Sequence, residues 1–220
     1  MVDTVIFDVD GTLVDTNYIH VVTWWEAFRQ YEHDVPMARV HRAIGMGSDK
    51  LLDHALPEDR DRTADDEIRA AHRHLYGEFW TRLRAFDGAA ELLRACAGRG
   101  LKVVLASSAS EREMRALRAA LDAEDAITVA TSSDDAEESK PAPDIVQVAL
   151  TRAGTRPERA VFVGDTVWDV QACAKAGVPC VAVLTGGISR HELAEAGAVA
   201  LYESVADLLR RFDDSPLTGH

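Results

Sequence analysis

Val5-Ile6-Phe7-Asp8-Val9-Asp10-Gly11-Thr12 lies close to the N-terminus and decides the fold. Its uninterrupted apolar run is typical of a buried strand in a parallel sheet. Side chains alternate along an extended chain, so Asp8 and Asp10 leave the strand in the same direction, and Gly11 then permits a sharp turn. Ligands of open α/β sheets bind beyond the carboxyl ends of the strands. The stretch therefore predicts a polar site there, although an ordinary acidic turn would have the same local sequence.

Three later apolar runs end in polar or turn-forming residues in the same way. They are the run 101–106 before Ser107-Ser108, the run 160–163 before Gly164-Asp165, and the run 179–183 before the loop 185–187. Asp169 follows Asp165 by four residues, and the proline-bracketed loop 139–144 holds Lys140 just before a helix. Taken singly, each feature has an ordinary explanation, and Lys140 would be a solvated charge. Together they predict one polar site on a parallel sheet.

The helices of this α/β pattern also have sequence signals. Ser110-Glu111-Arg112-Glu113 is a capping box that opens one helix, and Pro143 at a first helical turn opens another. Four further helices are expected at about 88–98, 167–176, 189–196 and 203–212.

The chain divides into two kinds of sequence. Residues 86–220 alternate helices and strands as a parallel sheet requires, whereas residues 16–85 contain no good strand. Five apolar residues of this segment are spaced by three and four, as on one face of a helix: Ile68, Ala71, Leu75, Phe79 and Leu83. We predict a doubly wound, Rossmann-like α/β core of residues 1–15 and 86–220, with an all-helical cap domain of residues 16–85 inserted. The alternative is that these helices simply pack beside the sheet.

The order of the motifs resembles a known family. Asp8-Val9-Asp10-Gly11-Thr12, then Ser107, then Lys140, then Gly164-Asp165 with Asp169 is similar to the four-motif signature of the haloacid-dehalogenase-like superfamily. It is most similar to the phosphatases of the phosphoglycolate-phosphatase and β-phosphoglucomutase type. The resemblance spans residues 2 to about 210. It implies a helical cap between the first two motifs and a Mg²⁺-dependent phosphatase that acts on a small phosphate ester.

The paired aspartates suit this chemistry. Hydrolysis of a phosphate ester needs neutralised charge, a nucleophile held in line and a proton for the leaving oxygen. Asp8 fits the nucleophile, because a carboxylate can form an aspartyl-phosphate. Asp10 can protonate the leaving group and later deprotonate the attacking water. That role needs a proton on Asp10 near neutral pH, and we expect the nearby acids to raise its pKa.

The remaining motif residues predict a metal and a phosphate site. Asp8, Asp165 and Asp169 would repel one another without compensation, and a hard divalent cation with oxygen ligands, Mg²⁺, would resolve this. The resemblance implies that Asp8 and Asp165 bind it through their side chains and Asp10 through its backbone carbonyl, with Asp169 in a supporting position. Ser107 and Ser108, with the backbone N–H groups of the following helix start, are expected to bind phosphate. Lys140 is expected to bind phosphate as a point charge.

Signals in the predicted cap are weaker. Gly45-Met46-Gly47-Ser48 fits a flexible loop that reaches the site and contacts the substrate, and it fits an ordinary turn between helices equally well. His20 lies where some relatives have a functional histidine, but a lone histidine on a helix also fits a surface or packing position.

Charge and composition exclude several partners. The 220-residue chain has a net charge of −13, which argues against nucleic acid and anionic membranes because both bind basic surfaces. This field also repels a phosphate ester, so Lys140 and the metal must supply local attraction. No apolar stretch approaches the ~20 residues of a membrane span. Cys96, Cys173 and Cys180 lack metal-ligand spacing and indicate reduced thiols in a cytoplasmic protein.

Three other activities and one non-catalytic function compete with a phosphatase. Haloalkanoate dehalogenases and phosphonate-cleaving enzymes of this superfamily lack the second aspartate, which is present here as Asp10. A sugar phosphomutase is the second candidate: the cap arginine that holds the distal phosphate in β-phosphoglucomutase aligns with Ser48, and Lys50 could substitute for it. A non-catalytic interaction protein on the same fold would require a lost nucleophile, metal ligand or lysine, and none is missing. The sequence carries no signal for one particular ester or for an oligomeric state.

Overall fold

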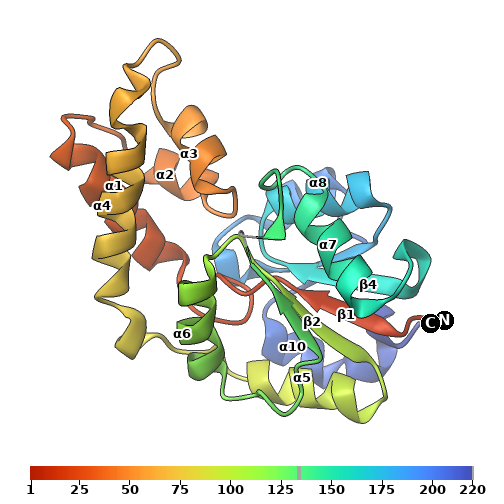
Figure 1. Cartoon of the computed structure of the whole chain (residues 1–220). Helices are drawn as coiled ribbons and strands as arrows, with labels where there is room; N and C mark the ends of the chain where they lie inside the picture. The colour runs from red at the N-terminus through yellow and green to blue at the C-terminus, as the bar shows by residue number, and fades with distance from the viewer. Residues whose placement is uncertain (133–134, 220) are drawn as a thin grey trace.

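A six-stranded parallel sheet forms the centre of the computed structural model, which describes residues 1–132 and 135–219 (Figure 1). Its strand order is β3-β2-β1-β4-β5-β6. The strands are β1 (Thr4–Phe7), β2 (Lys102–Ala106), β3 (Val129–Thr131), β4 (Ala160–Gly164), β5 (Cys180–Val183) and β6 (Ala200–Tyr202). The predicted α/β fold with a parallel sheet is confirmed.

The first strand lies in the middle of this sheet. β1 pairs with β2 on one side and with β4 on the other, so that Thr4 is opposite both Lys102 and Ala160. Val5, Ile6 and Phe7 are fully buried, as their uninterrupted apolar sequence predicts. The strands β2 and β3 lie on one side of β1, and the later strands β4, β5 and β6 lie on the other, so the direction of strand order reverses at β1. Such a reversal opens a crevice at the carboxyl ends of the strands.

Helices cover both faces of the sheet. Val5 and Phe7 of β1 pack with apolar residues of α5 (Ala89–Gly98), α6 (Glu111–Leu121) and α10 (Val205–Arg210). Ile6, which points to the opposite face, packs with α7 (Asp144–Ala153), α8 (Val167–Ala176) and α9 (Arg190–Ala196). Figure 1 shows α7 and α8 on one side of the sheet and α5 and α10 on the other. All six predicted helices of the α/β region are therefore present.

The segment of residues 16–85 is helical throughout its regular elements. It contains α1 (Asn17–Gln30), α2 (Met37–Ala43), α3 (Ser48–Ala55) and α4 (Asp65–Gly77), with short 3₁₀ turns at Arg62–Ala64 and Trp80–Arg82. These helices share an apolar cluster of their own, which includes Trp24, Phe28 and Leu52. Figure 1 shows them grouped to one side of the sheet. We call residues 16–85 the helical segment; its function as a cap stays a prediction.

The two connections to the helical segment run side by side. The backbone N–H of Asp15 donates to the carbonyl of Arg84, and that of Phe86 donates to the carbonyl of Leu13, both at 2.9 Å. Two adjacent crossings are what an inserted segment requires. Among the described residues, no helix combines the length and apolar character needed to cross a bilayer.

Two strands were missing from the sequence prediction. β3 and β6 are three residues long and lie at the two edges of the sheet, where they are only partly buried. Short, half-exposed edge strands lack the long apolar run that marks a central strand. The predicted helix at 203–212 is also shorter, because α10 spans Val205–Arg210 and a 3₁₀ turn follows at Phe212–Asp214.

Candidate active site

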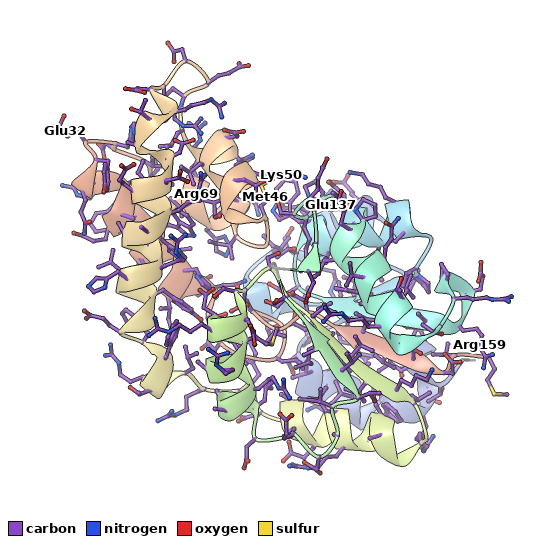
Figure 2. The ribbon with its side chains drawn as sticks, in the orientation of Figure 1. Glu32, Met46, Lys50, Arg69, Glu137 and Arg159 are labelled. Carbon is purple, nitrogen blue, oxygen red and sulfur yellow. The ribbon has the colours of Figure 1, made fainter. Side chains whose placement is uncertain are left out.

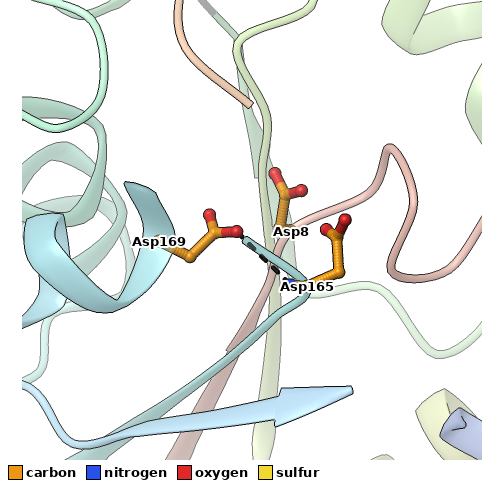
Figure 3. A group of neighbouring side chains, drawn as sticks. All are labelled: Asp8, Asp165 and Asp169. Carbon is orange, nitrogen blue, oxygen red and sulfur yellow. Dashed lines mark hydrogen bonds between the residues drawn. The ribbon is translucent and has the colours of Figure 1, made fainter. Parts of the chain in front are cut away.

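Three carboxylates converge at the carboxyl ends of the central strands (Figure 3). Asp8 follows β1, Asp165 follows β4, and Asp169 lies in the first turn of α8. One oxygen from each carboxylate lies within 4.8 Å of the others. Asp8 is 3% exposed, and Asp165 and Asp169 are fully buried. The acids that the sequence predicted to converge are therefore brought together.

Lys140 is buried among these acids. Its Nζ donates to Asp8 Oδ1 at 2.6 Å and to Asp169 Oδ1 at 2.8 Å, and the side chain is 1% exposed. Burial alone would lower the pKa of Lys140, but the charges of Asp169 and Asp8 raise it instead. Lys140 is thus a permanent buried cation and not a solvated surface charge.

The second oxygen of Asp169 is also engaged. Asp169 Oδ2 accepts hydrogen bonds from the Thr166 hydroxyl at 2.6 Å and from the backbone N–H groups of Asp165 and Thr166 at 3.3 and 3.0 Å. Thr166 caps α8 in a reciprocal arrangement with Asp169. Both oxygens of Asp169 therefore hold protein groups, which fits the supporting position predicted for it.

One lysine does not balance the acid cluster. Burial, above all, raises the pKa of Asp8 well above its usual value, with the charges of Asp169, Asp165 and Asp10 adding to the effect against that of Lys140. Burial and the charge of Asp169 raise the pKa of Asp165 to about 7. Carboxyls that resist ionisation in this way favour an additional positive charge beside them.

The donor set fits a hard divalent cation. Asp8 and Asp165 offer only oxygen atoms, the ligand type that Mg²⁺ prefers. Thr12 and Asn17 each donate to one oxygen of Asp165 at 2.8 Å, which fixes its carboxylate. A buried acceptor, Asn17 Oδ1, has no hydrogen-bond partner among the described residues. These residues would hold Mg²⁺, which would supply charge neutralisation for a bound phosphate.

Asp10 lies beside the cluster with several hydrogen-bond donors. Its Oδ1 accepts from the Thr16 hydroxyl at 2.8 Å and is 3.3 Å from Nε2 of His20, and its Oδ2 accepts from the Ser107 hydroxyl at 3.0 Å. Burial would raise the pKa of Asp10, but the hydrogen bond and charge of His20, with the two hydroxyl donors, lower it. The expected rise was therefore wrong, because donors to the carboxylate outweigh the effect of burial.

His20 connects Asp10 to a stack of aromatic rings in the helical segment. Its Nδ1 is 3.2 Å from Nε2 of His72, and its ring stacks on Tyr76 with centroids 4.0 Å apart. His72 stacks on Trp24 at 3.9 Å, and burial lowers the pKa of His72 well below its usual value. Sequence reasoning missed this chain of contacts, since no local signal links residues on α1 and α4.

The predicted phosphate-binding serines are present at the same edge. Ser107 is 1% exposed, and its Oγ donates to Asp10 while accepting from the backbone N–H of Ala109 at 2.9 Å. Ser108 lines the adjoining cavity. The capping box predicted at Ser110 and Glu113 is present at the start of α6, next to these serines.

A cavity of about 520 Å³ lies between the acid cluster and the helical segment. Asp8, Asp10 and Lys140 line it from the sheet, and all four residues of the loop Gly45–Ser48 line it from the helical segment. A Cβ on Gly47 would lie 2.2 Å from Cβ of Ser139, and one on Gly45 would lie 2.9 Å from Thr166. Glycine is therefore needed for this loop to approach the core so closely. The loop contacts the core directly, as the substrate-loop prediction requires.

Lys50 and Asp49 hold the same loop against the core. Lys50 Nζ donates to the carbonyl of Ser139 at 2.7 Å and to Glu138 at 3.2 Å, and the Ser139 hydroxyl donates to Asp49 at 2.8 Å. Lys50 is not among the residues that line the cavity. Its ammonium group is engaged by Ser139 and Glu138 instead.

Two arginines of α4 face the cavity and were missed from the sequence. Arg69 and Arg73 line it together with His72 and Tyr76, because residues four apart share a helix face. Arg69 pairs with Asp66 at 2.7 Å, whereas no hydrogen bond or ion pair links Arg73 to another described residue. Figure 2 shows Arg69 on α4 and Met46 on the neighbouring loop. The cavity therefore has two cationic side chains in addition to Lys140 and the expected metal.

Comparisons with known proteins agree on one family. The model of the haloacid dehalogenase-like hydrolases matches residues 2–177. The phosphoglycolate phosphatase of Escherichia coli (strain K12) is 30% identical over 231 residues, covering 93% of this chain and 90% of that protein. A hydrolase from Pseudomonas syringae has a structure with a TM-score of 0.90 and 31% identity, covering 96% and 98% of the two chains. CbbY from Rhodobacter sphaeroides in complex with phosphate has a TM-score of 0.78 and 25% identity, covering 94% and 96%.

Proposed function

The chain belongs to the haloacid dehalogenase-like hydrolases and is a phosphoric monoester hydrolase, and we propose that it cleaves a small phosphorylated metabolite with Mg²⁺ as its cofactor. The observation that carries the proposal is the buried Asp8, Asp165 and Asp169 cluster around Lys140, which opens onto the cavity. Buried free thiols at Cys96, Cys173 and Cys180 support a reducing, cytoplasmic location.

Asp8 is proposed as the nucleophile. Lys140 holds its Oδ1, and no hydrogen bond to Oδ2 is found among the described residues. Attack by a carboxylate oxygen forms a bond to phosphorus and breaks the bond to the ester oxygen. Lys140 stabilises the charge that develops on the phosphoryl group. Water then attacks the phosphorus, the bond to Asp8 breaks, and inorganic phosphate leaves.

Asp10 is proposed to move the protons of both steps, with His20 as its partner. The donors around Asp10 keep its pKa low and its carboxylate ionised, and an ionised carboxylate can accept the proton of the attacking water. In the first step the leaving oxygen needs a proton, and Nε2 of His20 lies 3.3 Å from Asp10 Oδ1, where it can supply one. We propose that this proton passes through Asp10 to the leaving oxygen and that His72 orients the His20 ring.

The substrate is proposed to carry a second acidic group on its leaving portion. Arg69 and Arg73 line the cavity from α4, and no described acid pairs with Arg73. The E. coli relative is named for phosphoglycolate, an ester whose leaving portion carries a carboxylate. A charge-assisted hydrogen bond to such a group would add affinity that a neutral leaving group lacks.

Matched esters test this substrate class. The enzyme should cleave 2-phosphoglycolate faster than ethyl phosphate, and 3-phosphoglycerate faster than glycerol 3-phosphate, in kcat/KM. Arg73→Ala should lose this preference by about tenfold or more. Arg210→Ala, which changes an exposed arginine of α10, should keep it. Equal rates on acidic and neutral esters would contradict the proposal.

A sugar phosphomutase is the second candidate. Ser48 lines the cavity without charge and Lys50 is bound to Ser139 and Glu138, which supports hydrolysis. Arg69 and Arg73 nevertheless provide cations that could hold a distal phosphate. Incubating β-glucose 1-phosphate with the protein, Mg²⁺ and a trace of the bisphosphate separates the two. Glucose 6-phosphate that accumulates faster than free phosphate would overturn the hydrolase assignment.

The metal is tested by phosphate release from a panel of phosphorylated metabolites. Release should stop when a chelator removes divalent cations and return with added Mg²⁺, because the buried acids then regain a compensating charge. Full turnover in excess chelator would refute the metal assignment.

A further inference from the structure

Asn17 is the first residue of α1, yet its side chain lies in the core beside Asp165. It is 3% exposed. Its Nδ2 donates to Asp165 Oδ2 at 2.8 Å and to the carbonyl of Gly186 at 3.4 Å. Its Oδ1 is buried and has no hydrogen-bond partner among the described residues. A residue of the helical segment therefore fixes a predicted metal ligand and presents an unused acceptor next to it.

The surroundings fix which way the amide points. Asp165 Oδ2 and the Gly186 carbonyl are both acceptors, so the nitrogen of Asn17 must face them. Turning the amide over would place oxygen against two oxygens and would leave the nitrogen without an acceptor. With Nδ2 held in this way, Oδ1 points away from both acceptors and has no donor among the described residues.

Asn17 also has little room to move away. A Cβ on Gly11 would lie 2.3 Å from Asn17 Nδ2, and a Cβ on Gly186 would lie 1.8 Å from Asp165 Oδ2 and 2.9 Å from Asn17 Nδ2. Two glycines therefore make the space in which the amide and the carboxylate meet. His41 of α2 approaches the same Gly186 carbonyl at 2.8 Å, so the helical segment holds this loop at two points.

We propose that Asn17 is a positioning residue of the cation site. Its Nδ2 orients Asp165, and its Oδ1 accepts a hydrogen bond from a water molecule of the hydration shell of the cation. Mg²⁺ keeps several waters when it binds to proteins, and groups that orient its ligands contribute strongly to affinity. A buried acceptor without a protein donor is otherwise costly. The inference rests on the proposed Mg²⁺ site and adds a residue outside the four motifs.

Two substitutions of Asn17 should both weaken Mg²⁺ binding. Asn17→Ala removes donor and acceptor, and we expect Mg²⁺ to bind about 10- to 100-fold more weakly. Asn17→Asp replaces the Nδ2 donor by an oxygen that faces Asp165 Oδ2 and the Gly186 carbonyl, so Asp165 loses its orientation and we expect weaker binding here as well. A residue with a merely structural role would lower the Tm of both variants in chelator and leave the Mg²⁺ dissociation constant unchanged.

The measurement is the Mg²⁺ dissociation constant from calorimetry on the full chain without substrate, with the Mg²⁺-induced rise in Tm as a second readout. Thr23→Ala is the matched control: Thr23 is a buried residue of α1 whose hydroxyl bonds to Ile19 within the helix, and its affinity should stay within about twofold. Affinity of Asn17→Ala and Asn17→Asp within about twofold of wild type would overturn the role of Asn17 alone. A wild-type chain that binds no Mg²⁺ would overturn the metal assignment itself.

Discussion

Replacing Lys140 by methionine should lower the free energy of unfolding by much more than a typical substitution does. Methionine has nearly the length of lysine but no charge, so Asp8 and Asp169 would lose the ammonium that lies 2.6 and 2.8 Å from them. All three side chains are at most 5% exposed, so solvent cannot screen the loss. Removing one partner of such a buried network costs about 3–5 kcal/mol of unfolding free energy. In a chain of this size that lowers Tm by about 6–20 °C.

The assay is urea unfolding of wild type and Lys140→Met in chelator at about pH 7.5. Lys175→Met is the control, because Lys175 is exposed and its Nζ only donates to the Pro141 carbonyl; its loss should stay within about 0.5 kcal/mol. The loss in Lys140→Met should shrink as the pH falls, since protonation neutralises the uncompensated acids, and Mg²⁺ should restore part of it. A loss below about 1 kcal/mol with no pH dependence would refute the buried-charge interpretation.

Three further results are expected. The stabilisation of the fold by Mg²⁺ relative to chelator should grow as the pH rises from about 4 to 7, because Asp8 and Asp165 have raised pKa values and must lose protons to hold the cation; the lowered pKa of His72 acts on both curves alike, and a stabilisation by Mg²⁺ that does not depend on pH would contradict this. His20→Gln should slow alkyl phosphates by about 10²-fold or more but p-nitrophenyl phosphate much less, since a nitrophenolate leaves without a proton; equal losses on both would exclude His20 from proton delivery. Alanine at Met46 or Ser48 should change the ranking of substrates more than the rate on p-nitrophenyl phosphate, because the loop can touch only the leaving group; uniform losses in kcat/KM would mark the loop as structural.

The parts of the site that could be predicted from sequence lie on the strands themselves. Asp8 and Asp10 follow a central apolar run, and Asp165 follows another, so strand direction alone brings their backbones to one edge of the sheet. Lys140 was predicted to belong to the site but not to be fully buried between two acids. Its placement depends on how the loop before α7 packs against Asp8 and Asp169.

The residues that sequence reasoning missed all come from the helical segment. His72, Arg69 and Arg73 enter the cavity because one face of α4 is turned towards the core, and no local pattern specifies that orientation. Asn17 has the sequence of an ordinary helix start, and only the fold places it against Asp165.

The pKa of Asp10 shows a second kind of limit. Counting nearby acids predicted a raised pKa, because acids are visible in the motifs. The opposite result follows from donors at Thr16, His20 and Ser107, which converge on one carboxylate only after folding. The hydrogen bonds to the ionised form, together with the charge of His20, then outweigh burial.

Trapping the phosphorylated enzyme tests the central claim most directly. The protein is quenched in acid during turnover of 2-phosphoglycolate with Mg²⁺ and reduced with borohydride, which converts an acyl phosphate of aspartate to homoserine. Peptide mass spectrometry should find homoserine at position 8, dependent on both substrate and Mg²⁺, and aspartate at position 10. Homoserine at position 10, or an unmodified Asp8 in an enzyme that is turning over this ester, would contradict Asp8 as the nucleophile.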